Sequence, residues 1–306
     1  ANTAGTITGL GDEAVTVTDV TLSSTDLNSL DLNTSGTITL SNATTINVAN
    51  GETLNLNNFT LSNSVTINDS TGNENITGTS NSDTLNLNGG NDTVNLGEGS
   101  DTVNVNIGNI DTNDNITDTG TSGTDTLNVN GTGTIDSASL IDVSGFETLN
   151  LGSGDNTITF DDTTEFSNFT SEFTNIVDAG GTDTLSFGST AVIGDLDFSK
   201  LSEFENLDLS SVADTIILSG DESENVNGLA GNDTFSLDFS NIDNFSIDGG
   251  ANTDDVILSG SSNSITSDTE FGHETSFTNI ERLDISSLSL NTLDSSTEFE
   301  FTDALL

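Results

Sequence analysis

The sequence contains no cysteine, which excludes disulfide bonds, thiolate zinc sites and cysteine nucleophiles. Tryptophan and tyrosine are also absent, and with them the aromatic platforms that carbohydrate-active enzymes usually present. The single histidine, His273, lies in EFGHETSF, which has no nucleophile-elbow pattern. The sequence therefore predicts a protein that is not an enzyme.

Positive charge is almost absent. The 306 residues include 2 Lys and Arg against 50 Asp and Glu, which gives a formal net charge of −48. Such a chain cannot neutralise phosphates, so binding to nucleic acid is excluded, and anionic membrane surfaces repel it. Salt screens charge but does not specifically neutralise carboxylates packed side by side. Bound metal ions are therefore the expected source of counter-charge.

Hydrophobic residues are scarce. They make up 31% of the chain, and low hydrophobicity combined with high net charge is typical of disorder. No run approaches the roughly 18 apolar residues of a membrane span, so no transmembrane segment is predicted. The first ten residues lack the basic and hydrophobic regions of a signal peptide. Disorder is the expectation for the metal-free chain, but the spacing of the apolar residues predicts order once metal is bound.

Apolar residues recur in pairs with one residue between them, flanked mostly by Thr and Asn. Examples are the pairs Leu85 and Leu87, Val94 and Leu96, and Val103 and Val105. A two-residue period places both side chains of a pair on one face of a strand, and no segment shows a sustained helical period. Strands this short bury a core only by stacking on neighbours, as in a solenoid. The predicted fold class is all-β, a parallel β-roll with two nine-residue units in each coil.

The stretch NGGNDTVNLGEGSDTVNV, residues 88–105, contains nearly the same nine residues twice. Asp83, Asp92 and Asp101 are nine residues apart, and each precedes a Thr and an apolar residue. Glycine before the aspartate permits a tight turn, and Ca²⁺ takes about six to eight oxygen ligands from carboxylates and carbonyls. Stacked turns place one aspartate above another, which is repulsive unless a cation lies between them. The repeat therefore predicts several Ca²⁺ sites.

This repeat resembles the RTX, or haemolysin-type, calcium-binding nonapeptide, in which a Gly-Gly-x-Gly-x-Asp turn precedes a short strand. Further copies are GLAGNDTFSL, DGGANTDDVIL, AGGTDTLSF and SGTDTLNV, whereas GSGDNTITF has Asn156 in place of the aspartate. The resemblance implies a right-handed parallel β-roll or β-helix solenoid that holds calcium between adjacent turns. It also implies export by type I secretion and folding in extracellular calcium. The residues that it assigns to calcium are Asp83, Gly90, Asp92, Gly99, Asp101, Asp125, Gly181, Asp183, Gly231, Asp233, Gly250 and Asp254.

The distribution of the repeats predicts five segments within one continuous rod. Residues 71–130 form an RTX-like calcium β-roll, and residues 219–260 form a second RTX-like calcium segment. Residues 1–70 and 261–306 form terminal β rungs, and residues 131–218 form wider β-helical rungs.

A second phrase recurs outside the RTX-like copies. It reads FETLNL from Phe146, FENLDL from Phe204 and FTNIERLDI from Phe277. Each phenylalanine directly precedes an expected strand. The interpretation is that these three phenylalanines fill the core of wider rungs.

Acidic, Cys-free, Lys-poor β chains with scattered RTX turns and FETLNL rungs resemble the lattice-forming parts of RTX-containing S-layer proteins. That resemblance implies a calcium-dependent structural protein, extracellular at a bacterial cell surface, that self-assembles into a lattice or filament. Its partners would be calcium and further copies of itself, with any cell-surface glycan anchor in a region outside this chain. Two further functions stay open: a spacer segment of a large type I-secreted RTX adhesin, and the secretion and folding module of an exported enzyme. The end of the chain, TEFEFTDALL, resembles the tail of type I secretion substrates.

Thr-x-Thr phrases, such as TIT from Thr37, would place threonines in a row on a flat face. Ice-binding solenoids use such rows. The sequence does not show a sustained row, so ice binding ranks below the lattice, the adhesin spacer and the secretion module as an interpretation.

Overall fold

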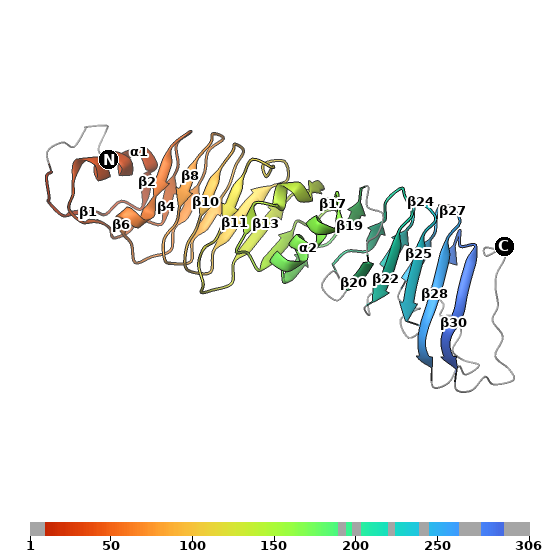
Figure 1. The fold of residues 1–306 in the computed structure, drawn as a ribbon. Helices are drawn as coiled ribbons and strands as arrows, with labels where there is room; N and C mark the ends of the chain where they lie inside the picture. Colours follow the sequence, from red (N-terminus) through yellow and green to blue (C-terminus); the bar gives the residue numbers. More distant parts are fainter. Residues whose placement is uncertain are drawn as a thin grey trace. The chain divides into compact units, whose positions relative to one another are not determined.

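The computed structural model describes residues 10–188, 194–197, 203–219, 224–238, 245–262 and 277–290. These residues fall into two units that interleave in the sequence. The first is built from residues up to 132, from 138–153 and from 171–179, and the second from 133–137, 154–170 and the residues from 180 onward. Each unit is a stack of parallel strands (Figure 1).

The first unit contains three parallel sheets. The largest has the order β18-β16-β13-β11-β9-β7-β4-β2, with strands β2 (Thr21–Ser23), β4 (Thr45–Asn47), β7 (Thr66–Asn68), β9 (Thr84–Asn86), β11 (Thr102–Asn106), β13 (Thr126–Asn130), β16 (Thr148–Leu151) and β18 (Asn175–Asp178). The second has the order β15-β12-β10-β8-β5, with strands β5 (Thr53–Asn55), β8 (Asn75–Thr77), β10 (Thr93–Asn95), β12 (Asn115–Thr117) and β15 (Val143–Ser144). The third has the order β1-β3-β6, with strands β1 (Val15–Val17), β3 (Ile38–Leu40) and β6 (Phe59–Thr60).

The core of the first unit consists of columns of apolar side chains, one from each coil. Strands β9, β10 and β11 begin nine residues apart and alternate between the two larger sheets, as the repeat predicts. The middle residue of each triplet points inward because side chains alternate along a strand. The column in the largest sheet is in register and fully buried: Ile46, Ile67, Leu85, Val103, Leu127 and Leu149. The predicted all-β parallel solenoid is confirmed.

The second unit repeats this construction with longer strands. Its seven-stranded sheet, in the order β14-β17-β19-β21-β23-β26-β29, contains β14 (Gly133–Asp136), β17 (Asn156–Phe160), β19 (Thr184–Phe187), β21 (Asn206–Asp208), β23 (Glu224–Asn227), β26 (Phe245–Asp248) and β29 (Phe277–Thr278). Its five-stranded sheet, in the order β20-β22-β25-β28-β30, contains β20 (Gly194–Asp197), β22 (Thr215–Ser219), β25 (Thr234–Asp238), β28 (Asp255–Ser262) and β30 (Arg282–Leu290). A two-stranded sheet pairs β24 (Ala230–Gly231) with β27 (Ala251–Asn252).

In the part of the chain that the structure describes, two α-helices contradict the expectation that no segment has a helical period. They are α1 (Ser24–Asn33) and α2 (Thr163–Glu172), and two short 3₁₀ helices, η1 (Leu56–Asn58) and η2 (Ser137–Leu140), accompany them. The Ser23 hydroxyl caps α1 by accepting from the backbone N–H of Asp26 at 3.2 Å. Helix α2 packs Phe169 edge-on against Phe160, with ring centroids 5.3 Å apart. Neither helix is long and apolar enough to cross a membrane, and this holds for the described residues as a whole.

The prediction that a phenylalanine fills the core before a strand is correct for two of the three phrases. Phe146 and Phe204 are each 1% exposed and fill the core, as expected. Phe277 is only half-buried, and Ile280 is the buried residue instead. The equivalent phrases are therefore FETL, FENL and IERL, because Ile280 precedes a glutamate and a strand as the two buried phenylalanines do.

Two neighbouring residues of β22 test which side chains of a strand point into the core. Ile216 is 0% exposed and Ile217 is 46% exposed. We expect Ile216→Ala to lower the free energy of unfolding by about 2–5 kcal/mol, because it leaves a cavity. The matched change Ile217→Ala should cost about 1 kcal/mol or less. Urea unfolding in saturating calcium measures both, and equal losses would contradict the assignment.

Candidate metal centres

An acidic residue directly before a strand caps the preceding coil at several places; in the largest sheet Asp83, Asp101, Asp125 and Glu147 precede β9, β11, β13 and β16. The Asp83 carboxylate accepts a hydrogen bond from the backbone N–H of Val65 at 3.0 Å, and Asp101 accepts from the N–H of Asp83 at 2.5 Å. Asp125 accepts from Asp101 at 2.6 Å, and Glu147 accepts from Asp125 at 2.8 Å. We call such a series a carboxylate ladder. It satisfies buried backbone N–H groups at the strand starts that would otherwise lack a partner.

Three further carboxylate ladders follow the same rule. On the other edge of the first unit, Asp92 accepts from the N–H of Glu74 at 2.8 Å and Asp114 accepts from the N–H of Asp92 at 2.9 Å. The second unit has two ladders, which run through Asn156, Asp183 and Glu205 and through Asp214, Asp233, Asp254 and Glu281.

The turns before these acids are tight because glycines bring successive coils into backbone contact. A Cβ on Gly90, where φ is +148°, would lie 1.4 Å from the carbonyl oxygen of Gly72 in the preceding coil. The predicted glycines all face backbone atoms of the preceding coil too closely for a side chain: Gly90, Gly99, Gly181, Gly231 and Gly250. Their assignment as carbonyl ligands of calcium stays a prediction.

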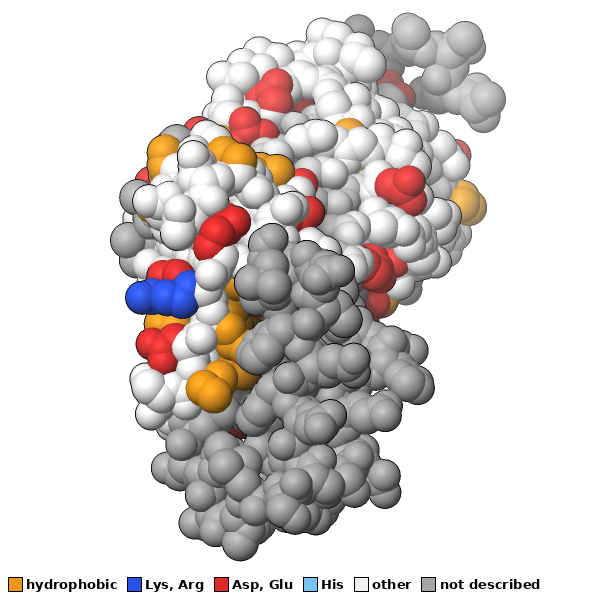
Figure 2. Space-filling model, turned by 90° about the vertical axis from the view of Figure 1, so that its right-hand side faces the viewer, with side chains coloured by type: hydrophobic (Ala, Val, Ile, Leu, Met, Phe, Trp, Pro, Cys, Tyr) orange, Lys and Arg blue, Asp and Glu red, His pale blue; other side chains and the backbone are white. Residues whose placement is uncertain are grey.

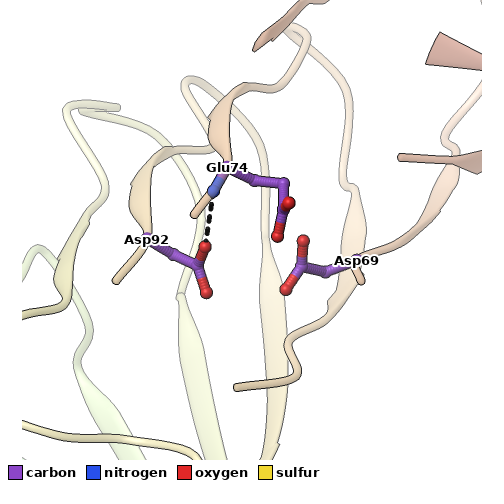
Figure 3. A group of neighbouring side chains, drawn as sticks. All are labelled: Asp69, Glu74 and Asp92. Atoms are coloured by element: carbon purple, nitrogen blue, oxygen red, sulfur yellow. Dashed lines mark hydrogen bonds between the residues drawn. The ribbon is translucent and has the colours of Figure 1, made fainter. Parts of the chain in front are cut away.

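The first candidate centre consists of Asp69, Glu74 and Asp92, whose ligand atoms lie within 4.8 Å of one another. Figure 3 shows the three carboxyl groups converging from two adjacent turns. Each is at least nine-tenths buried and has one oxygen already hydrogen-bonded. The other oxygen of each, Asp69 Oδ1, Glu74 Oε2 and Asp92 Oδ2, has no hydrogen-bond partner. Three buried, unpartnered anionic oxygens at one point are the chemistry of a cation site.

Asp69 reaches this centre because it occupies an interior position. The backbone N–H of Asp69 pairs with Asn86, and the N–H of Leu87 pairs with Asn104 in the next coil, so Asp69 and Leu87 occupy the same place in successive coils. The coils on either side of Asp69 have the buried residues Val48 and Leu87 at this place. Asp69 therefore points inward from a row of core residues.

The second candidate centre consists of Asp101, Asp118 and Asp125, also within 4.8 Å of one another. It lies in the turns that enter β11 and β13, whereas the first centre lies in the turns that enter β8 and β10. The Oδ2 atoms of Asp101 and Asp118 are buried without a hydrogen-bond partner. Asp118 occupies the interior place that Leu96 has in the preceding coil. The two centres are thus built alike, each with one inward-pointing aspartate.

Burial raises the pKa of these carboxyl groups. Burial, reinforced by the neighbouring carboxyl groups of Glu74 and Asp92, raises the pKa of Asp69 to about 7. Burial, opposed by the hydrogen bond from Asp83 and reinforced by Asp118, raises the pKa of Asp101 to about 8. Burial also raises the pKa of Asp92, to about 6. In the absence of a cation, a proton is therefore retained near neutral pH at groups that would otherwise be ionised.

The donor set of both centres suits Ca²⁺. All the side-chain ligands are hard carboxylate oxygens, and neither cysteine nor histidine takes part. Three carboxylates would more than balance the charge of one Ca²⁺, and its remaining positions can be filled by turn carbonyls or water. The residues that would hold the ion are Asp69, Glu74 and Asp92 in the first centre and Asp101, Asp118 and Asp125 in the second.

The structure places the predicted aspartates in different roles. Asp92, Asp101 and Asp125 lie in the two centres. Asp83 does not, because its Oδ1 accepts from Val65 and its Oδ2 accepts from the N–H and hydroxyl of Thr79. It caps a coil and closes its own turn with both oxygens.

The predicted aspartates of the second unit are Asp183, Asp233 and Asp254. All three are buried members of carboxylate ladders. The Oδ2 atoms of Asp233 and Asp254 have no hydrogen-bond partner, and burial raises the pKa of Asp233 to about 6. Within the described residues, these aspartates do not form a three-carboxylate group like those of the first unit.

The sequence reasoning missed Asp69, Glu74 and Asp118. Glu74 was detectable, since GNENI at 72–76 aligns with GNDTV at 90–94 and puts Glu74 in the place of Asp92. The signal at Asp69 and Asp118 is an aspartate two residues after a strand's core residue, where Leu or Val is expected.

The comparison with known protein families agrees with this geometry. Residues 69–103 match the RTX calcium-binding nonapeptide repeat, in four copies. RTX repeats bind calcium, and the match contains the whole first centre and Asp101 of the second. No curated protein and no solved structure matches the chain. RTX repeats therefore identify this segment as calcium-binding, and the second centre extends beyond it.

Replacing one ligand of the first centre should weaken calcium binding without removing the cap. In Asp92→Asn the amide oxygen can still accept from Glu74, while the charge of the unpartnered Oδ2 is lost. We expect one class of sites to lose at least about tenfold in affinity, or about 1.4 kcal/mol. Isothermal titration calorimetry measures it, with the exposed Asp142→Asn as control. Unchanged affinity would remove Asp92 from the ligand set.

The metal-free protein should become less stable as pH rises. The folded-state pKa of Asp101, about 8, is above its ordinary value of 3.8, so the folded state binds the proton more tightly than the unfolded state. This stabilisation is fully present below the ordinary pKa and is lost as pH rises through about 8.

Circular dichroism in chelator between about pH 5 and pH 8.5 spans most of this window, and the β signal should fall as pH rises, because protonation at low pH partly replaces the missing cation. The variant Asp101→Asn removes the titrating group and should flatten the dependence, whereas the exposed Asp142→Asn should leave it as in the parent. Identical slopes in the parent and Asp101→Asn would contradict the shifted pKa.

Proposed function

We propose that this protein is a calcium-dependent extracellular structural protein whose copies assemble into a surface layer or filament on a bacterial cell. The observation that carries the proposal is the set of buried, unpartnered carboxylate oxygens in two centres between coils. Calcium bound there joins adjacent coils and offsets their mutual repulsion. Folding and calcium binding would then be one linked equilibrium.

The charge of the chain supports an assembly that also depends on calcium. A net charge of −48 keeps copies apart in the absence of a counter-ion. Figure 2 shows acidic side chains scattered over a mostly uncharged polar surface. Arg282 is already paired with Asp255 of the neighbouring strand at 2.5 Å. Calcium ions bridging carboxylates of neighbouring copies would supply the missing positive charge.

We further propose that the protein is not an enzyme. Acidic groups with raised pKa accept hydrogen bonds from backbone N–H groups at strand starts or lie in the two candidate metal centres between coils. His273, the only histidine in the sequence, lies outside the described residues. The tail TEFEFTDALL, which resembles those of type I secretion substrates, lies outside them as well.

A calcium titration of chelator-treated protein tests the structural role. Circular dichroism should report a gain of β-structure with calcium, and electron microscopy of the same samples should show ordered sheets or filaments. Magnesium is the matched control, because it carries the same charge but holds its water and demands octahedral geometry. It should therefore reproduce screening without the structural transition.

Each other outcome has a definite meaning. Calcium-induced folding into single particles, with no assembly, would replace the lattice by the spacer segment of an adhesin. Catalytic activity in a longer product of the same gene would favour a secretion and folding module. A chain that is fully folded in chelator and indifferent to calcium would contradict the proposal as a whole.

A further inference from the structure

The outer face of the largest sheet is a regular array of threonine and asparagine. The triplets of β4, β7, β9, β11 and β13 each turn a Thr and an Asn outward on either side of a buried apolar residue. The threonines are in register across five strands: Thr45, Thr66, Thr84, Thr102 and Thr126. The asparagines form a second row, Asn47, Asn68, Asn86, Asn104, Asn128 and Asn150, which extends to β16. We call this surface the Thr/Asn face.

The asparagine row is held rigid by its own hydrogen bonds. Each side-chain amide nitrogen donates to the Oδ1 of the asparagine in the preceding coil, at 2.7 to 3.0 Å, from Asn150 down to Asn47. The threonines are stiff at χ1 because they are β-branched. The array therefore has little side-chain entropy to lose when it meets a ligand.

The Thr/Asn face carries no charged side chain, although the sequence has 50 Asp and Glu. The outer face of the five-stranded sheet of the first unit, β15-β12-β10-β8-β5, has the same residue types in a different order. There the two rows alternate, Thr53, Asn75, Thr93, Asn115 in one and Asn55, Thr77, Asn95, Thr117 in the other. A uniform Thr row beside a uniform Asn row thus distinguishes the outer face of the largest sheet from that of the sheet β15-β12-β10-β8-β5.

The dimensions and chemistry of the Thr/Asn face exclude most ligands. Six strands spaced about 4.8 Å apart span about 24 Å, and two rows lie about 7 Å apart along the strands. A stable protein partner needs about 800 Å² on each side, with aromatic or apolar anchors. The face offers less area and no anchor, and it lacks the charge to hold an ion. It suits an uncharged ligand that is itself flat, periodic and able to hydrogen-bond at every repeat.

We propose that the Thr/Asn face binds the surface of ice. Ice is a neutral lattice of water, and the hydroxyl and methyl groups of the threonine row can order water at fixed intervals beside the amide row. The sequence alone gives little support for this function, because the threonine row predicted from the Thr-x-Thr phrase at Thr37 is not sustained. The row instead arises from the Thr-apolar-Asn triplets, which the nine-residue alternation places in one sheet. The proposal does not depend on lattice assembly.

Partition into a slowly growing ice hemisphere tests the proposal, using calcium-loaded full-length protein at a concentration where it is monomeric. The parent should enter the ice, whereas an inert control protein stays in the liquid. The variant Thr84→Tyr/Thr102→Tyr places two bulky rings on the Thr/Asn face and should be excluded to the level of the inert protein. The matched variant Thr53→Tyr/Thr93→Tyr changes the alternating face and should enter the ice as the parent does.

Three results would overturn the proposal. Exclusion of the parent from ice would refute ice binding itself. Equal incorporation of both variants, or equal exclusion of both, would refute the assignment to this face, provided that each shows the calcium-induced β signal of the parent. If a variant fails to fold, Thr84→Val/Thr102→Val keeps the shape of the strands and removes only hydroxyl groups. That variant should reduce incorporation relative to Thr53→Val/Thr93→Val, and equal incorporation of the two would count against the proposal.

Discussion

The structure depends on the different roles of the two oxygens of each buried carboxylate. In Asp92 and Asp101, one oxygen accepts a hydrogen bond from a backbone N–H at the start of a strand in the preceding coil. The other oxygen has no hydrogen-bond partner. The first contact ties coil to coil through the backbone. The second leaves a buried negative charge that must find a cation or a proton. The feature that orders the stack thus also creates its need for a counter-ion.

This division accounts for a folded chain with few hydrophobic residues. Each coil contributes narrow apolar triplets to the core columns, and the rest of its burial is polar. Buried aspartates such as Asp92 and Asp254 satisfy backbone groups that hydrophobic side chains could not. A composition typical of disorder is compatible with this fold because the ladders and RTX repeats replace part of the missing core with hydrogen bonds and bound calcium.

The sequence predicts the periodic parts of the structure and misses the exceptions. Alternating apolar residues were sufficient for the parallel solenoid, and the nine-residue spacing of aspartates after glycine turns led to Asp92 and Asp101, which lie in the two centres. Asp69 and Asp118 were missed because an aspartate at one interior place, next to Leu87 in one row and to Leu96 in the other, is visible only after the coils are aligned. Helix α2 was missed because ten residues with an Asp162 cap and Phe166 and Phe169 three apart make a short signal among strands. The register of the IERL phrase was wrong because Phe277 resembles a core residue more than Ile280 does.

Uniform columns create a problem of register. A coil that slid along the stack by one whole repeat would still place Val or Leu on Val or Leu and Asn on Asn, at almost no cost. Asp69 and Asp118 are different from their neighbours in the interior rows, and each completes a three-carboxylate group only with particular turns. Displacement by one coil would separate each of them from the two carboxylates that complete its group and leave its charge buried away from the bound cation. The two centres therefore fix the register of the stack. They make one alignment of the coils of this repetitive chain more stable than any alignment that is shifted by a coil.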